Sequence, residues 1–250
     1  MFAISYDSVE VLADFAAKHD ITYELLSDEG SRVIRELGLL NERVHEHHAV
    51  YGIAQNDRAW GVPYPGVFLL DEQGRVTEKR FQSSYRERET GAGVLGQGFH
   101  AQSSVHRPEA SAGADGVSVG VSLDSGTYSF FQRLWLSVEI RIEPGLHVYG
   151  RPIPEGYTSF SVDVAPIAGV VFGEPEWPDP QPFRVEGLDE QFFVYEGSVS
   201  VSLPVTLALR DAGDQMLEVT VRWQACSAVD CLMPNSVTLV LPVRSVDLVS

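Results

Sequence analysis

The chain has 250 residues, of which 44% are hydrophobic and 21% charged, a composition typical of a globular protein with one large or two medium domains. Its formal net charge of −17 disfavours binding to the phosphate backbone of nucleic acids. No stretch approaches the roughly 18 apolar residues of a membrane-spanning helix, so we expect no insertion into a membrane.

Strands and helices alternate up to about residue 95. Asp7, with Glu10 three residues later, resembles a capping box that would open a helix running to Lys18. The elements expected here are, in chain order, a strand over residues 2–6, this helix, a strand over 23–26, a helix over 31–37, hairpin strands over 66–70 and 75–81, and a helix over 86–95. This alternation predicts an α/β domain over residues 1–95.

The pattern changes after this part of the chain. Residues 96–115 are rich in Gly, Ser, Ala and Gln without periodicity, which is typical of a flexible linker. Beyond them, apolar residues recur at every second position, most clearly over residues 133–142 and 199–207. Several short strands with turn signals between them predict a β-sandwich over residues 116–250.

Two glycine motifs match known patterns in their letters but not in their context. Residues 91–96 fit the dinucleotide fingerprint, yet a polar, charged segment precedes them where a strand is required. Residues 116–120 fit the nucleophile elbow, but their neighbours alternate as in a continuous strand and offer no strand-to-helix turn. We therefore expect neither a nucleotide cofactor nor a serine nucleophile, and no other cofactor.

A cluster of imidazoles, His45-Glu-His47-His48, contains ordinary metal ligands. Adjacent side chains in a loop rarely converge on one ion, and no cysteine lies near them in the sequence. A solvated loop is therefore the favoured interpretation, and no metal site is expected.

Cys226 and Cys231 are the only cysteines of the chain. They separate an alternating run that ends at Trp223 from one that begins at Val237, so both thiols are expected at one end of a strand pair, close enough to bridge. In the chain-entropy model, a loop of about six residues gives only about 2 kcal/mol of stabilisation. A redox-active pair is therefore favoured, while a structural disulfide and two unpaired thiols remain as alternatives.

Four stretches of the first half carry a resemblance to a known family: Phe2-Ala-Ile-Ser-Tyr-Asp7, Leu26-Ser-Asp-Glu-Gly30, Tyr51-Gly52 and Val62-Pro-Tyr-Pro65-Gly-Val-Phe-Leu-Leu-Asp71. Residues 1 to about 95 thus resemble the C-terminal part of a peroxiredoxin of the AhpC/TSA class, within the thioredoxin superfamily. The resemblance implies a cis Tyr64–Pro65 bond beside the active site.

The cysteine of that family lies upstream of the strand that here begins at Met1. Because residues 1–225 contain no cysteine, peroxidase activity of this chain alone is not expected. A central strand is missing as well, so strands 2–6 and 66–70 must pair directly or keep open edges. We therefore expect a fragment, or a start placed too far downstream.

Three stretches of the second half carry another resemblance: His147 to Tyr157, Val194 to Pro204, and above all Gln224-Ala-Cys226-Ser-Ala-Val-Asp-Cys231-Leu-Met-Pro234. This half resembles the periplasmic N-terminal domain of the thiol:disulfide interchange protein DsbD family, an immunoglobulin-like sandwich. The resemblance implies that Cys226 and Cys231 are a redox-active pair, which receives electrons from a membrane-embedded partner domain and passes them to exported proteins.

The family shields its pair with a cap loop that carries an aromatic residue. Residues 189–193 are the candidate, although their spacing departs from the pattern, and Phe192 and Phe193 fit a core position equally well. Tyr149 and Tyr157 are expected to line the same end, and Pro65 is a further candidate through the first resemblance. A structural role stays open for the tyrosines.

The charges around the pair favour attack by a partner over an autonomous nucleophile. Asp230 adjoins Cys231, and Arg222 is the nearest cation in the sequence, so nothing obvious lowers a thiol pKa. We therefore expect a partner's thiolate to attack the oxidised pair and form a mixed disulfide.

Taken together, the sequence predicts a truncated thioredoxin-like α/β domain followed by an immunoglobulin-like β-sandwich. The predicted function is thiol–disulfide exchange through Cys226 and Cys231, with thioredoxin-like or membrane thiol–disulfide exchange proteins as partners. An extracytoplasmic location is implied by the resemblance, although no signal peptide opens the chain. The alternatives are a non-catalytic interaction module with a structural disulfide, or a fragment of an AhpC/TSA peroxiredoxin.

Overall fold

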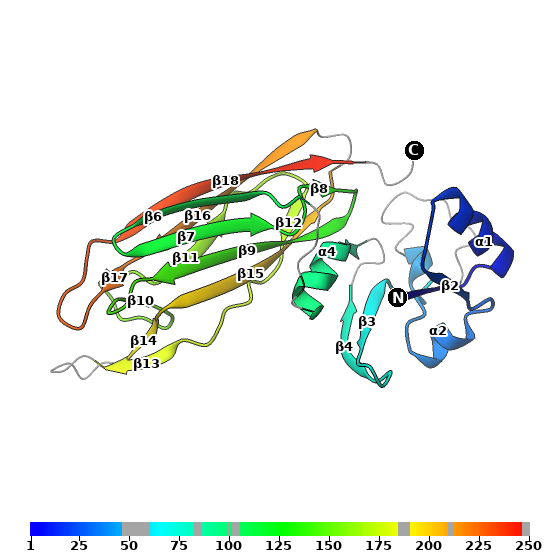
Figure 1. Cartoon of the computed structure of the whole chain (residues 1–250), viewed down its shortest axis with the longest axis horizontal. Helices are drawn as coiled ribbons and strands as arrows, with labels where there is room; N and C mark the ends of the chain where they lie inside the picture. The colour runs from blue at the N-terminus through cyan, green and yellow to red at the C-terminus, as the bar shows by residue number, and fades with distance from the viewer. Residues whose placement is uncertain are drawn as a thin grey trace. The chain divides into compact units, whose positions relative to one another are not determined.

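A computed structural model describes residues 1–46, 61–82, 87–99, 101, 106–184, 191–209 and 213–246 (Figure 1). The chain forms two compact units, Met1–Arg88 and Glu89–Ser250.

The described part of the first unit includes a parallel strand pair, the helices α1 and α2, and a hairpin. Its elements are β1 (Phe2–Ser5), α1 (Val9–Lys18), β2 (Glu24–Ser27), α2 (Arg32–Glu36), β3 (Gly66–Leu70) and β4 (Val76–Phe81), followed by β5 (Arg88–Glu89) at the boundary of the units. β1 pairs with β2 in parallel, and β3 pairs with β4 antiparallel. The predicted order of strands and helices is thus confirmed up to residue 81, and β5 replaces the start of the helix expected over 86–95.

The start of α1 differs from the prediction. Its N-cap is Ser8, whose Oγ accepts a hydrogen bond from Val11 N (3.4 Å), so the capping box on Asp7 and Glu10 was wrong. The carboxylate of Asp7 instead accepts a hydrogen bond from Ser5 Oγ (2.5 Å). Ser8 and Asp7 are both good capping residues, and the bond from Ser5 decides which of them remains available.

The two edges expected around the missing strand remain open in the described part of the chain. β1 pairs only with β2 and β3 only with β4, so no single thioredoxin-like sheet is assembled there. Apolar side chains stay uncovered beside β1: Phe2 is 64% exposed and Val9, on α1, is 72% exposed.

The Tyr64–Pro65 bond is trans, so the cis bond implied by the first resemblance was wrong; the cis bond that the described residues contain is Arg151–Pro152. Hydrogen bonds on both sides hold this segment extended as it enters β3. Tyr64 N donates to Leu39 O (2.8 Å), and Gln82 N donates to Pro65 O (3.2 Å).

The second unit is a β-sandwich. Its elements are α4 (Gly91–Gly93), η2 (Val94–Gly98), β6 (Glu109–Ala114), β7 (Val117–Leu123), β8 (Thr127–Tyr128), β9 (Gln132–Ile142), β10 (His147–Tyr149), β11 (Ser161–Val164), β12 (Val170–Phe172), β13 (Gln181–Arg184), β14 (Gln191–Tyr195), β15 (Ser198–Leu207), β16 (Asp214–Trp223), β17 (Ala225–Cys226) and β18 (Asn235–Ser245). One sheet has the order β12-β15-β9-β7-β6 and the other β11-β16-β18-β8, while β13-β14-β10-β17 form a smaller sheet at one end (Figure 1).

Alternate side chains of both large sheets form one core, as the period-two pattern predicts. Its buried members include Leu134, Leu136, Val138 and Ile140 of β9, Val201, Leu203 and Val205 of β15, Leu217, Val219, Val221 and Trp223 of β16, and Leu241 of β18. Each fully buried aliphatic side chain contributes about 1.5–3 kcal/mol, so the stability of this unit rests mainly on these strands.

Part of the segment expected as a linker belongs to the sandwich. β6 pairs antiparallel with β7, joining Ala110 to Val121 and Ala112 to Val119, and its alanines pack against the core. A tight turn with positive φ at Asp115 and Gly116 connects the two strands. The small residues of β6 give it the composition of a linker. Their alternation between exposed and half-buried positions is nevertheless that of an edge strand. Residues 117–120 lie in β7, so the segment that matches the nucleophile-elbow pattern is a strand, as predicted from the sequence.

The glycines of residues 91–96 serve packing in this unit. Thr90 caps α4 by accepting a hydrogen bond from Gly93 N (2.8 Å), and its hydroxyl donates to the carboxylate of Asp124. A Cβ on Gly93 would lie 2.8 Å from Asp124 Oδ2, so the close approach requires glycine. Trp135 strengthens the contact, since its Nε1 donates to Glu89 Oε1 (2.8 Å).

Candidate functional site

The two cysteines lie on a tight hairpin at the end of the sandwich formed by the smaller sheet. β17 ends at Cys226, and Ser227 N donates to Asp230 O (2.8 Å), which turns the chain back. Ser227 Oγ also accepts from Asp230 N (3.1 Å). Cys231 then forms an isolated antiparallel bridge to Cys226, so this local turn brings the two side chains together.

Cys226 and Cys231 form a disulfide, with an S–S distance of 2.07 Å and a Cα–Cα distance of 4.0 Å. The bridge predicted from their spacing is present, and two unpaired thiols are not. The two residues differ in exposure: Cys226 is 0% exposed, whereas Cys231 lies in the exposed stretch that follows the turn. A reagent from solution therefore meets Cys231.

The smaller sheet has two faces with different neighbours. Val148 of β10, Tyr195 of β14 and Ala225 of β17 belong to the main core. The intervening residues face the other way, because side chains alternate along a strand. Cys226 lies on that second face and packs in a separate cluster. Its buried members are Tyr149, Phe192, Val194 and Cys226, with Ile153, Tyr157 and Phe183 packed against them.

Three aromatic rings of this cluster contact one another beside the disulfide. The ring centroids of Tyr149 and Tyr157 are 5.1 Å apart, and that of Phe192 lies 5.4 Å from Tyr149 and 5.2 Å from Tyr157. Such tilted and edge-to-face pairs stabilise by about 0.5–1.5 kcal/mol each beyond burial. The cluster therefore fixes the apolar wall against which Cys226 packs.

Tyr149 also touches the sulfur of the more exposed cysteine, since its Oη lies 3.5 Å from Cys231 Sγ. A disulfide sulfur carries no hydrogen, so the phenol is the donor. Burial, with a smaller contribution from Tyr157, raises the pKa of Tyr149 above its ordinary value of 10.0. The hydroxyl thus keeps its proton at neutral pH and remains available to a sulfur anion.

Replacing Tyr149 by phenylalanine is expected to raise the pKa of the Cys231 thiol in the reduced protein. The hydroxyl stabilises the thiolate by a hydrogen bond to a charged atom, a contribution of about 1.5–3 kcal/mol and hence about 1–2 pKa units. The pH dependence of iodoacetamide alkylation measures this pKa in the Cys226→Ser background. Tyr157→Phe is the matched control, and equal pKa values in the two tyrosine variants would contradict the role of Tyr149.

Gln224 holds the loops on either side of the disulfide. Its Oε1 accepts a hydrogen bond from Thr158 N (3.0 Å), and its Nε2 donates to Leu232 O (3.0 Å). It thereby joins the segment after Tyr157 to the segment after Cys231. Sequence reasoning missed this role, although a polar residue beside a buried tryptophan in a strand could have signalled it.

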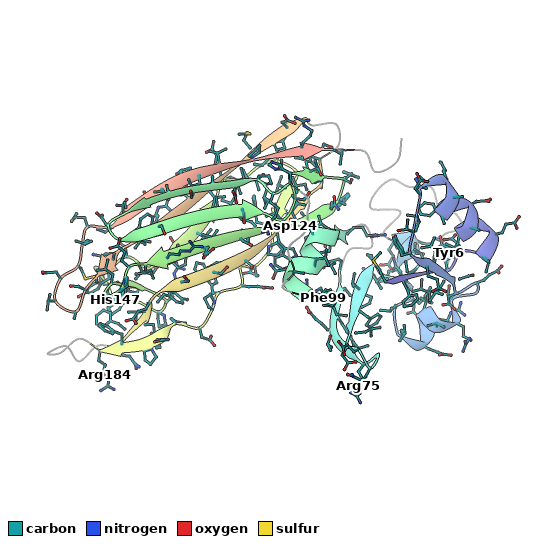
Figure 2. All side chains as sticks on the ribbon, viewed as in Figure 1. Tyr6, Arg75, Phe99, Asp124, His147 and Arg184 are labelled. Carbon is teal, nitrogen blue, oxygen red and sulfur yellow. A yellow bond between two sulfur atoms is a disulfide. The ribbon has the colours of Figure 1, made fainter. Side chains whose placement is uncertain are left out.

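His147 is a second buried polar residue that sequence reasoning missed. Its side chain lies at the end of the sandwich (Figure 2), and the residue is 3% exposed. Its ring centroid is 4.5 Å from that of Phe183 and 5.5 Å from that of Tyr149. Burial lowers the pKa of His147 below its ordinary value of 6.5, while Glu196 acts weakly in the opposite direction. The imidazole is therefore neutral at neutral pH.

Of the other predicted site residues, Phe192 lies beside the disulfide, whereas Phe193 does not. Phe192 is fully buried in the cysteine cluster, whereas Phe193 is half-buried, pairs with Pro182 and lies on the other face of β14. Residues 189 and 190 of the candidate cap lie outside the described residues. Pro65 belongs to the other unit.

The cation nearest in sequence is also engaged away from the pair. Arg222 forms an ion pair with Asp163 of β11, and both side chains are largely exposed. Among the described residues, the hydrogen-bonding group next to Cys231 Sγ is the hydroxyl of Tyr149.

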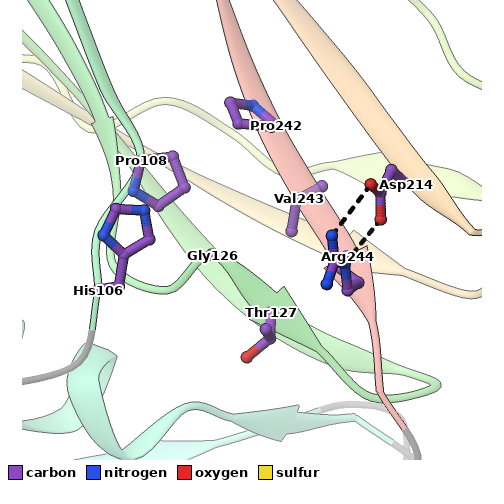
Figure 3. Close-up of a pocket in the computed structure, with 8 residues that line it drawn as sticks. All are labelled: His106, Pro108, Gly126, Thr127, Asp214, Pro242, Val243 and Arg244. Atoms are coloured by element: carbon purple, nitrogen blue, oxygen red, sulfur yellow. Dashed lines mark hydrogen bonds and ion pairs between the residues drawn. The ribbon is translucent and has the colours of Figure 1, made fainter.

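A separate hollow of about 330 Å³ lies at β8 and the end of β18 (Figure 3). Its lining residues are His106, Pro108, Gly126, Thr127, Asp214, Pro242, Val243 and Arg244. Arg244 there is paired with Asp214 through two hydrogen bonds (2.9 and 3.3 Å). The hollow contains no cysteine, so it is distinct from the disulfide site.

The described ranges contain no group of three or more His, Cys, Asp and Glu side chains that could hold a metal ion, and His47 and His48 of the imidazole cluster lie outside them. Within the same ranges, no helix has the length and apolar character needed to cross a membrane.

Solved structures with local similarity include two N-terminal domains. The N-terminal periplasmic domain of ScsB from Proteus mirabilis is 19% identical over 54% of this chain and 51% of its own, about half its length, with a TM-score of 0.41. The reduced N-terminal domain of DsbD from Neisseria meningitidis is 16% identical over 55% and 85%, with a TM-score of 0.33. No curated protein matches the chain.

Family models match both halves. The model for the N-terminal domain of the thiol:disulfide interchange protein DsbD matches residues 123–242, and that of the AhpC/TSA family matches residues 1–79. Together with the Cys226–Cys231 disulfide, these matches support a thiol–disulfide redox role. The chain therefore joins a segment that resembles the AhpC/TSA family to a domain that resembles the N-terminal domain of DsbD.

Proposed function

We propose that the sandwich is a thiol–disulfide relay in which Cys231 is the sulfur that partner proteins attack. The observation that carries this proposal is the unequal exposure of the two cysteines, one fully buried before the turn of the hairpin and one exposed after it. Thiol–disulfide exchange needs access to one sulfur in line with the bond that breaks. Cys226, packed among aromatic rings, is then the leaving group.

The proposed exchange has two steps. A partner's thiolate attacks Cys231 Sγ, the Cys226–Cys231 bond breaks, and Cys226 Sγ takes the electron pair and then a proton. A second thiolate of the partner then attacks the partner's sulfur atom that is bonded to Cys231. This step releases Cys231 as a thiolate and leaves the partner with a disulfide. The relay has then gained two electrons, and the same steps in reverse pass them to the next protein.

The partners proposed are thioredoxin-like or membrane thiol–disulfide exchange proteins, in an extracytoplasmic compartment. The match of residues 123–242 to the DsbD family model supports this class of partner. An oxidising compartment is also where a disulfide persists between exchanges.

A structural disulfide in a non-catalytic interaction module is the second candidate. The short sequence separation of five residues disfavours it, because closing so small a loop stabilises by only about 2 kcal/mol. A peroxidase is disfavoured further, since the AhpC/TSA-like residues contain no thiol to attack a peroxide.

The reduction potential of the pair tests the relay. We expect a value between about −120 and −270 mV, the range of exchange-active proteins, measured by equilibration of the full chain with glutathione buffers. Reduced thioredoxin should also reduce the pair, whereas the Cys226→Ser, Cys231→Ser double variant should accept no electrons. A potential well below about −300 mV, with no reduction by thioredoxin, would mark a structural bond.

A further inference from the structure

One polar atom at the site has no partner in the oxidised protein. His147 Nε2 is buried and makes no hydrogen bond to any described residue. Leaving such a group unpaired costs about 1–3 kcal/mol, so it requires a physical explanation. A hydrogen-bond donor that exists only in another state of the protein would provide one.

The sheet register places a cysteine beside this imidazole. β10 and β17 are antiparallel, and His147 is directly opposite Cys226. Directly opposed residues project from the same face of a sheet, with Cβ atoms about 4.5–5.5 Å apart. The oxidised sulfur of Cys226 has no hydrogen to donate, but reduction creates an S–H group at this position.

The surroundings of His147 favour a neutral imidazole that accepts a proton only transiently. Phe183 of β13 covers the ring, and Tyr149 of β10 lies at its edge. Glu196, at the end of β14, is exposed and favours the charged form only weakly. Arg184 of β13 is exposed as well. The buried carboxylates of the described residues are those of Asp28, Glu87 and Asp124, and none of them belongs to the smaller sheet, which leaves the imidazole as the base for Cys226.

We propose that His147 accepts the proton of the Cys226 thiol when this buried cysteine closes the disulfide, and donates a proton to Cys226 when the disulfide opens. This inference rests on the proposed relay and adds a residue to its chemistry. It also explains how a thiol can ionise in an apolar cluster, where burial by itself raises the thiol pKa.

The proton and electron changes balance at each step. In closing, the S–H proton of Cys226 moves to His147 Nε2, and the resulting thiolate attacks Cys231 Sγ in the mixed disulfide. The bond between Cys231 and the partner breaks, and the partner leaves as a thiolate with the electron pair. The imidazolium then loses its proton to solvent. In opening, His147 first takes a proton from solvent, and the resulting imidazolium protonates Cys226 as it leaves.

Ellman's reagent, an aromatic disulfide, separates the two cysteines kinetically. The full chain is first reduced with dithiothreitol and freed of it. Attack by Cys231 on the reagent then releases one coloured thiolate, and closure by Cys226 releases a second. We expect His147→Gln to slow the second release by about a hundredfold, the low end of general base catalysis, and to change the first by less than about twofold. His106→Gln, in the separate hollow, is the matched control.

The pH profile distinguishes a proton acceptor from a packing residue. In the wild-type chain, the second release should rise with pH through the lowered pKa of His147 and then level off. In His147→Gln it should keep rising beyond the ordinary thiol pKa of about 8.5, because burial raises the pKa of the Cys226 thiol. Equal rates and parallel profiles in the two proteins would overturn the inference, even if the wild type exchanges normally with thioredoxin. Failure of that exchange would instead overturn the relay.

A measurement on the wild type keeps the inference testable if His147→Gln does not fold. The imidazole resonances of the full chain, labelled with ¹³C at histidine Cε1, can be titrated in the oxidised and reduced states. We expect the His147 signal and its titration to shift on reduction, because a new hydrogen bond forms at Nε2, while His106 stays unchanged. Superimposable His147 titrations in the two states would contradict the proposed contact.

Discussion

A Cys226→Ser variant is expected to hold partner proteins in a stable mixed disulfide through Cys231, whereas Cys231→Ser is expected to trap almost none. The remaining thiol of the first variant is exposed, and no second thiol is present to release the partner. The remaining thiol of the second variant is fully buried among aromatic rings. Buried thiols in apolar surroundings are inert, so we expect trapping to be at least about tenfold slower.

A suitable probe for this difference is a thioredoxin whose resolving cysteine is replaced by serine and whose remaining cysteine is activated with Ellman's reagent, because this partner has no second thiol with which to release itself. The adduct is counted by non-reducing electrophoresis and by the mass of the intact species, with the double serine variant as the blank. Equal trapping by the two single variants would show that exposure does not select the attacked sulfur. Faster trapping by Cys231→Ser would reverse the proposed order of the two cysteines.

The second large effect is expected for Phe192→Ala. Phe192 is 0% exposed, and its ring contacts those of Tyr149 and Tyr157 beside the disulfide. Removing a buried phenylalanine ring costs about 3–5 kcal/mol of unfolding free energy, which urea unfolding of the full chain measures. The same change removes part of the wall around Cys226, so dithiothreitol should reduce the disulfide faster than in the wild type.

Phe193→Ala is the matched control for that experiment. This neighbour has the same chemistry but is half-buried on the other face of β14, away from Cys226. It should lose less stability and leave the rate of reduction unchanged, when both rates are measured at urea concentrations far below the unfolding transition. If both variants accelerate reduction equally, loosening of the whole domain is the cause, and Phe192 has no specific shielding role.

The strands of the sandwich were predictable because their main chemical requirement is local. A strand with one face in a core needs an apolar residue at every second position, and β9 and β15 show this pattern in the sequence itself. The disulfide was predictable for the same reason, since a five-residue separation across a turn constrains the two side chains without help from distant segments.

The residues that sequence reasoning missed depend on neighbours far away in the chain. His147 gains its meaning from Cys226, which lies opposite it only because β10 and β17 pair in one particular register. Gln224 is defined by its bonds to Thr158 and Leu232. A sequence window contains neither the register nor these loop contacts. β6 was missed for another reason, because alanine, serine and glycine occur both in linkers and in edge strands.

The two faces of the smaller sheet have an evolutionary consequence. Val148, Tyr195 and Ala225 pack in the main core. Substitutions at these positions should therefore be selected by their effect on the stability of the domain. Their strand neighbours His147, Tyr149 and Cys226 face the disulfide cluster. Mutation can therefore alter the acidity and accessibility of the pair while the backbone that carries it stays in place. A single set of three short strands would in this way allow related domains to diverge in redox behaviour without refolding.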